Sequence, residues 1–161
     1  MTSAQAWADG LRLCQEAIAK RTSFLIETTL AGRDPTRPPT YLKLMSDVKR
    51  QGFRVDLTFI ALENADVHVA RVADRVAAGL HDIPEQRIRE RYDLSLSRAA
   101  DALHIADHAL LIDNSSARFP FRAVAEFDRG RVVALDSNLP RWAGTVMNRF
   151  AAGIGSTERD P

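Results

Sequence analysis

The chain has 161 residues, of which 45% are hydrophobic, and this is enough for one domain with a sizeable core. Its 22 lysines and arginines nearly balance its 21 aspartates and glutamates, which argues against a polyanion-binding or membrane-surface protein. The single cysteine excludes a disulfide framework, and no apolar run of about 18 residues or secretion signal is visible, so we expect a cytoplasmic protein.

Helical and strand patterns alternate through the first part of the chain. Apolar residues at helical spacing predict a helix over 7–18. The segment 24–30, FLIETTL, is typical of a buried strand that ends in a carboxylate and two hydroxyls. Glycine and prolines predict a loop over 31–39, and a helix is expected over 40–51. Residues 55–62 change from alternating to continuously apolar, as strands of parallel sheets do.

The same alternation continues toward the C-terminus. In order, the sequence predicts a helix over 64–78, a helix over 84–104, a strand over 109–112, a hairpin of strands 123–127 and 131–135, and a helix over 142–150. Gly52 and Gly79 are expected to end the helices before them, and Pro84 to begin the next one. Such alternation with long crossovers favours an α/β fold whose mostly parallel sheet carries helices on both faces. We expect one domain over 1–152 and a flexible tail over 153–161.

The end of the predicted strand 24–30 is the first candidate site. Ligands of α/β proteins bind where the carboxyl ends of strands open onto a crevice, so Glu27, Thr28 and Thr29 are candidates for substrate contacts. The alternative is a strand that ends at the surface, with a threonine that caps a helix.

Arginines on the two helices around the turn 79–84 form the second candidate site. The basic residues that share a helix face are His68, Arg71 and Arg75 on one helix and Arg87, Arg91 and Arg98 on the next. Two such faces in one helical hairpin can close over a polyanion and stabilise a transferring phosphoryl group. The alternative is a pair of solvated faces on which acidic neighbours form ion pairs with the arginines.

A metal site receives weaker support from the sequence. His104 and His108 are spaced to share a helix face, but no third ligand is placed by sequence, so a polar helix end is the preferred interpretation and no metal ligand is assigned.

The near-neutral charge and the absence of interleaved aromatic residues argue against a nucleic-acid partner.

Several segments together resemble a known family. These are FLIETTLAG, QGFRVDLTFIAL, HVARVADRVAAGLHDIP, IRERYDLSL and LLIDNSS, in this order over residues 23–133. The series is similar to the bacterial zeta-toxin-like P-loop kinases, in the branch described as UDP-N-acetylglucosamine kinases. The resemblance implies a three-layer P-loop kinase-like fold with a mostly parallel sheet, a helical lid and a small C-terminal hairpin, lacking the N-terminal P-loop strand.

The resemblance also implies roles for the candidate residues. Glu27 of the ETTL motif would hold the sugar-nucleotide substrate, with Thr28 and Thr29 beside it. The lid arginines Arg75 and Arg91 would act in catalysis by gripping the ATP phosphates and the transferring group. The neighbouring positions implied in nucleotide binding are Arg71 and, with less support, Arg89 on the lid, and Asp113, Asn114 and Ser115 near the adenine.

The chain departs from the family at the phosphate-binding loop. No GxxxxGK[ST] string, whose backbone, lysine and hydroxyl hold phosphates and magnesium, occurs in the 161 residues. The letters Asn64-Ala65-Asp66 spell the family's catalytic motif in the wrong place, and we interpret Asn64 as a helix cap. Leu80 also stands where the family commonly has a second glycine.

Two hypotheses follow from this combination. The first is an ATP- and magnesium-dependent kinase that phosphorylates a sugar nucleotide such as UDP-N-acetylglucosamine, inactive as given because it lacks the loop. The second is an inactive remnant that binds a nucleotide, an antitoxin or another protein. The missing piece is explained equally by a misassigned start, by a separate complementing chain or by a pseudokinase.

Overall fold

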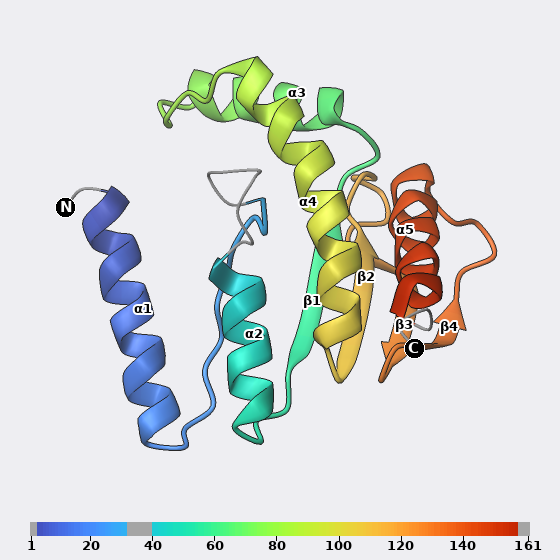
Figure 1. Ribbon diagram of the computed structural model, residues 1–161. Helices are drawn as coiled ribbons and strands as arrows, with labels where there is room; N and C mark the ends of the chain where they lie inside the picture. The colour runs from blue at the N-terminus through green and yellow to red at the C-terminus, as the bar shows by residue number, and fades with distance from the viewer. Residues whose placement is uncertain (1–2, 32–39, 158–161) are drawn as a thin grey trace.

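The computed structural model describes residues 3–31 and 40–157. In these residues five helices and four strands follow one another, as Figure 1 shows: α1 (Ser3–Ala19), α2 (Thr40–Arg50), β1 (Asp56–Ala61), α3 (Ala65–Ala77), α4 (Glu85–Ile105), β2 (His108–Asp113), β3 (Arg122–Asp128), β4 (Arg131–Leu135) and α5 (Arg141–Thr157). The fold is mixed α/β. None of the helices in this part of the chain is long and apolar enough to cross a membrane.

The four strands form one sheet in the order β1-β2-β3-β4. Only β1 and β2 pair in parallel, while β2–β3 and β3–β4 are antiparallel, so the expectation of a mostly parallel sheet is wrong for the described residues. The reason is the length of the connections. The helices α3 and α4 make one parallel crossover between β1 and β2, whereas the segment 114–121 is too short to make a second.

The hairpin of β3 and β4 confirms the prediction from the sequence. Arg129 and Gly130 form its two-residue turn, with φ angles of 46° and 73°. Positive φ at both central residues is the conformation that matches the twist of the two strands, and glycine accepts it at little cost.

The segment 24–30 is not a strand, so this prediction is wrong. Its side chains alternate as in a strand, with Leu25 92% exposed and Leu30 only 4% exposed. Among the described residues, however, no ladder of hydrogen bonds joins it to the sheet, because β1 pairs only with β2. Alternating apolar residues report which side chains are buried, and they do not supply the neighbouring strand that a sheet requires.

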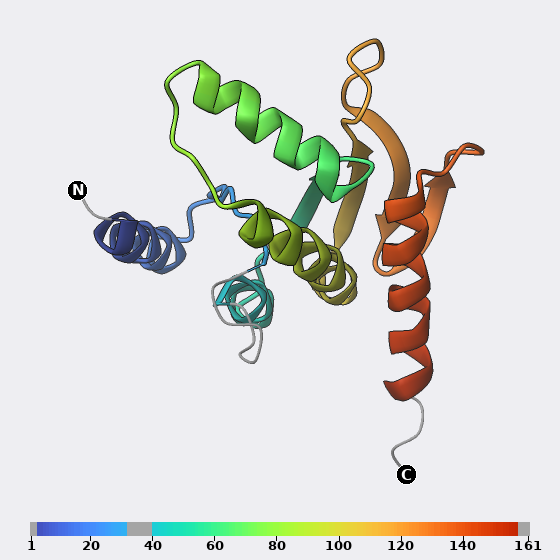
Figure 2. The same ribbon diagram turned by 90° about the horizontal axis from the view of Figure 1, so that it is seen from above.

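The helices lie mainly on one face of the sheet. Figures 1 and 2 show α2, α4 and α5 on this face, while α3 begins near the carboxyl end of β1 and runs from there away from the sheet. The outward side chain of Ile60 on β1 is 48% exposed, whereas its inward neighbour Phe59 is buried. The expected third layer is therefore not present in the described residues, since a single crossover places its helices on one side only.

The core lies between the sheet and the helices α4 and α5. Its largest fully buried side chains are those of Trp142, Phe127, Leu103, Leu111, Val124 and Val146. Trp142 packs edge-on against Phe59 with 5.9 Å between the ring centroids, which joins α5 to β1 across the sheet. This packing fixes the strand ends at which the candidate site lies.

Local signals in the sequence place some of the helix ends correctly. Asn64 caps α3, since its Oδ1 accepts a hydrogen bond from the Val67 amide at 3.0 Å, and Gly52 and Gly79 follow α2 and α3 with φ angles of 85° and 82°. Pro84 precedes α4 and is not its first residue. Helix α5 continues to Thr157 and so includes the first residues of the expected tail, whereas 158–161 lie outside the described residues.

Candidate functional site

The candidate site lies at the carboxyl ends of β1 and β2. The two strands end side by side, with Ala61 in register with Asp113. The chain leaves β1 to form the α3–α4 hairpin, which begins at this end of the sheet and extends away from it before α4 returns (Figure 1), and leaves β2 into the loop 114–121. The predicted nucleotide residues thus come from two elements that meet at one edge of the sheet.

Tyr92 attaches the hairpin to the end of β1. Its hydroxyl oxygen lies 3.1 Å from the carbonyl oxygen of Leu62 and 3.0 Å from that of Glu63. Its ring meets His68 of α3 edge-on, with 5.4 Å between the centroids. Burial, and then nearby carboxylates of which Glu63 acts most, raise the pKa of Tyr92 to about 12, so the hydroxyl remains a donor at neutral pH.

Arg89 forms ion pairs with two carboxylates. Its Nη2 atom is 2.7 Å from Glu85 Oε1 and 2.6 Å from Asp66 Oδ1, which joins the first turns of α3 and α4. The hydrogen bond with Glu85, and then that with Asp66, raises the pKa of Arg89. For this residue the structure therefore supports the ion-pair alternative over the expected contact with a nucleotide.

Arg71 brings the lid and the loop after β2 together. Its Nη2 atom donates a hydrogen bond of 2.7 Å to the main-chain carbonyl oxygen of Asn114. Two residues that the sequence assigned to nucleotide binding are thus in contact. Burial, and to a smaller extent the charge of Arg71, hold the pKa of His68 below its ordinary value of 6.5, so this imidazole is neutral at pH 7.

Arg75 and Arg91 are, together with Arg87, the hairpin arginines for which no partner is found among the described residues. Arg75 lies exposed in the last turn of α3 and Arg91 is half-buried on α4. Among the described residues neither side chain makes a hydrogen bond or an ion pair. A guanidinium without a carboxylate partner is available to an anionic ligand.

Glu27, Thr28 and Thr29 lie on the segment 24–30. Glu27 and Thr29 are exposed, whereas the Oγ1 of Thr28 accepts a hydrogen bond of 3.3 Å from the Leu30 amide. No hydrogen bond or ion pair joins Glu27 to the α3–α4 hairpin within the described ranges. Its assembly with Arg75 and Arg91 into one site therefore stays a prediction.

Asp113 has a structural role that the sequence did not reveal. Its carboxylate, of a residue that is 6% exposed, accepts hydrogen bonds from Ser115 Oγ at 2.5 Å and from Trp142 Nε1 at 3.3 Å. Arg122 lies 3.5 Å away and forms a second ion pair of 2.6 Å with Asp136. Burial by itself raises the pKa of Asp113, but the bonds from Ser115, Trp142 and Arg122 outweigh it, so the pKa lies below its ordinary value. These contacts fix the loop that begins with Asn114.

The described residues do not favour a metal at this edge. No group of three or more histidine, cysteine, aspartate or glutamate side chains among them is arranged to hold an ion. His104 and His108 do not share a helix face as expected, because α4 ends at Ile105 and His108 begins β2. His104 stacks on Phe150 at 4.4 Å and His108 pairs with Glu126 at 2.9 Å.

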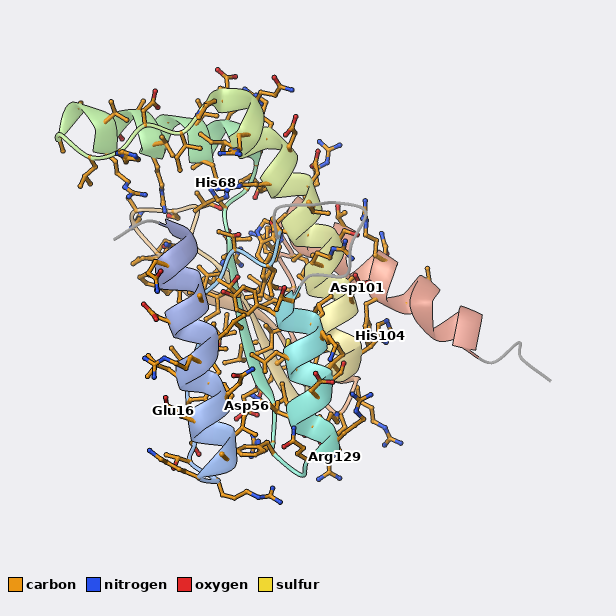
Figure 3. All side chains as sticks on the ribbon, turned by 60° about the vertical axis from the view of Figure 1, so that its left-hand side comes forward. Glu16, Asp56, His68, Asp101, His104 and Arg129 are labelled. Atoms are coloured by element: carbon orange, nitrogen blue, oxygen red, sulfur yellow. The ribbon has the colours of Figure 1, made fainter. Side chains whose placement is uncertain are left out.

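Two surface pockets lie away from the candidate site. One, of about 300 Å³, is lined by Lys49, His104, Ala106, Arg129, Gly130 and Phe150. The other, of about 670 Å³, lies between α4 and α5. Figure 3 shows His104 and Arg129 far from His68, which marks the hairpin end of the molecule. Neither pocket is lined by a residue that the sequence assigned to substrate or nucleotide binding.

Comparison with known proteins places the chain in a family. A family model described as Zeta toxin matches residues 1–135. An uncharacterized protein of Haemophilus influenzae is 32% identical over 76 residues, which are 47% of this chain and 50% of that protein. The match thus spans half the length of this relative. No solved structure matches.

Proposed function

Since the chain belongs to the zeta toxin family, we propose that its α3–α4 hairpin and strand ends form the nucleotide site of a small-molecule kinase. The reaction class is ATP-dependent phosphorylation of a sugar nucleotide such as UDP-N-acetylglucosamine. The observation that carries the proposal is that Arg75 and Arg91, like Arg87, have no partner among the described residues and lie on the helical hairpin that follows the carboxyl end of β1.

Each candidate residue has a role in this proposal. Arg75 and Arg91 bind phosphate oxygens and offset the negative charge of the transferring group. Glu27, with Thr28 and Thr29 beside it, accepts hydrogen bonds from the sugar nucleotide. Asn114 and Ser115 contact the adenine, on a loop that Asp113 holds in place.

Magnesium, which the family uses with ATP, neutralises phosphate charge when it is bound. The carboxylates of the described residues do not fit such a site, since Asp113 is occupied by Ser115, Trp142 and Arg122. We therefore assign no step to the ion.

A second function is favoured by the sequence itself. The 161 residues contain no GxxxxGK[ST] string, and phosphoryl transfer depends on the phosphate cradle and lysine that this string supplies. A module that binds a nucleotide without transferring phosphate, or that binds an antitoxin or another protein, needs neither group.

Binding and turnover distinguish these functions. In calorimetry with ATP we expect Arg75→Ala and Arg91→Ala each to weaken binding about tenfold or more, because each removes a charge-assisted hydrogen bond. In calorimetry with UDP-N-acetylglucosamine we expect Glu27→Ala to have a similar effect. Arg131→Ala, which removes an exposed arginine of β4, is the matched control and should bind both ligands like the wild type.

The results of these experiments distinguish a kinase, a nucleotide-binding module and a protein-binding module. Phosphorylated UDP-sugar detected by mass spectrometry after incubation with Mg-ATP supports the kinase. Binding of either ligand without product supports the nucleotide-binding module. No heat with either ligand, or an equal loss in Arg131→Ala, contradicts the nucleotide site and leaves protein binding as the function to test.

A further inference from the structure

Besides the buried side chains of α4 in the core, two side chains of the α3–α4 hairpin are found, among the described residues, to hydrogen-bond the chain just beyond β1 and β2, and they differ in character. Tyr92 of α4 contacts the carbonyl oxygens that follow β1, and Arg71 of α3 contacts the carbonyl oxygen of Asn114 that follows β2. The hairpin thus has one attachment at each of two neighbouring strand ends.

The attachment through Tyr92 is the stronger one. The side chain is half-buried, its hydroxyl reaches two successive carbonyl oxygens, and its ring packs on His68. The ion pairs of Arg89 with Asp66 and Glu85 join the two helices close to the same place. Because these contacts adjoin one another, the base of the hairpin is held by several groups at once.

The attachment through Arg71 is the weaker one. It is a single hydrogen bond from an exposed side chain to a neutral carbonyl oxygen, and no ion pair of Arg71 with a carboxylate is found among the described residues. Helix α3 contributes no buried residue of its own, and α4 is the element against which it packs. Helices that bury little apolar surface open at low free energy, so the loss of one bond affects α3 more than any core helix.

We infer that the hydrogen bond from Arg71 to Asn114 acts as a latch, which holds α3 to the loop after β2 and can break while the rest of the fold stays intact. Tyr92 keeps α4 in place when this bond is broken. Arg71 is then a positioning residue of the lid, and not one of the arginines that grip phosphate as the resemblance implies. The latch is independent of the proposed function, because it joins two parts of the ligand-free chain.

Hydrogen exchange of the ligand-free full chain tests this inference. We expect Arg71→Met to speed amide exchange in α3 by about two- to tenfold, the range that corresponds to one hydrogen bond. Exchange in α4 should not change. Tyr92→Phe, by contrast, should speed exchange in α3 and in the first half of α4 together.

Two control variants make the test specific. Asn114→Ala leaves the main-chain carbonyl in place, so α3 should exchange as in the wild type. Arg75→Met removes the same charge from the same helix without removing a contact, and it should also leave α3 unchanged. The latch is refuted if Arg71→Met exchanges like the wild type, if Arg75→Met accelerates α3 equally, or if Arg71→Met accelerates α4 as much as α3.

Discussion

The two sides of this molecule contrast in how completely they bury their apolar residues. On the side of β2, β3 and α5, Trp142 is 2% exposed and the carboxylate of Asp113 joins three elements. On the side of the segment 24–30 and the outer edge of β1, Leu25 is 92% and Ile60 is 48% exposed. The first side buries these groups against one another, although the edge strand β4 beside it leaves Val132, Val133 and Leu135 about half exposed. The second side presents apolar side chains and the edge of β1, which no strand of the described residues pairs. We therefore expect substitutions in the core of the first side to affect stability, and substitutions on the second side to affect association.

The largest effect is expected from the core of the first side. Trp142→Ala should lower the free energy of unfolding by about 3–5 kcal/mol, because it removes the indole ring packed on Phe59 and the donor to Asp113. Urea unfolding followed by circular dichroism measures the change. A loss below about 1 kcal/mol would show that α5 is not part of the cooperative core.

Asp113 gives a smaller, pH-dependent effect on the same side. Asp113→Asn should cost about 1–3 kcal/mol at pH 7, because Arg122 and Ser115 lose a charged acceptor. Because the pKa of Asp113 lies below its ordinary value of 3.8 in the folded chain, the ionised carboxylate stabilises the fold fully at pH values above 3.8. This stability is lost as the pH falls through the folded-state pKa. The difference between variant and wild type should therefore shrink from pH 7 to pH 3.

Urea midpoints at the two pH values provide this measurement. Asp128→Asn, at the exposed end of β3, serves as the control and should follow the wild type at both. If the stability gap of Asp113→Asn stays constant with pH, the ionised carboxylate is not the stabilising species.

The hairpin turn offers a test of backbone strain. Gly130→Ala should lower the free energy of unfolding by about 1 kcal/mol, because alanine is strained at a φ of 73°. A steric clash does not contribute, since the added Cβ would meet only Phe150, at an ordinary contact distance of 3.8 Å. Gly144→Ala on α5 is the matched control. That glycine has no positive φ, so alanine should stabilise by about 0.5–1 kcal/mol in thermal unfolding. Equal signs for the two variants would contradict this account.

The smallest stability effects are expected on the open side. Leu25→Ser and Ile60→Lys should change the free energy of unfolding by no more than about 0.5 kcal/mol, because both side chains are exposed. Ile60→Lys should in addition reduce concentration-dependent association in light scattering, as charge on an unpaired edge does. A cost comparable to that of Trp142→Ala would mean that this side is covered in solution.

The sequence alone determined the elements whose signals are local. Helical spacing, the cap at Asn64 and the glycines at 52 and 79 placed the helix ends, and alternation around Arg129 and Gly130 placed the hairpin. It did not determine whether 24–30 would pair, since a strand depends on a neighbour that its own residues do not specify.

For the candidate site too, the sequence determined some features and the tertiary structure decided the others. The sequence placed six arginines on one helical hairpin, but only the tertiary structure decided that Arg71 contacts Asn114, that Arg89 joins Asp66 and Glu85, and that Arg75 and Arg91 find no partner among the described residues. It also decided that Asp113 is held by Trp142 and Arg122. Helix periodicity fixes which face a side chain occupies, whereas its partner comes from a distant segment that only the packing of the chain brings near.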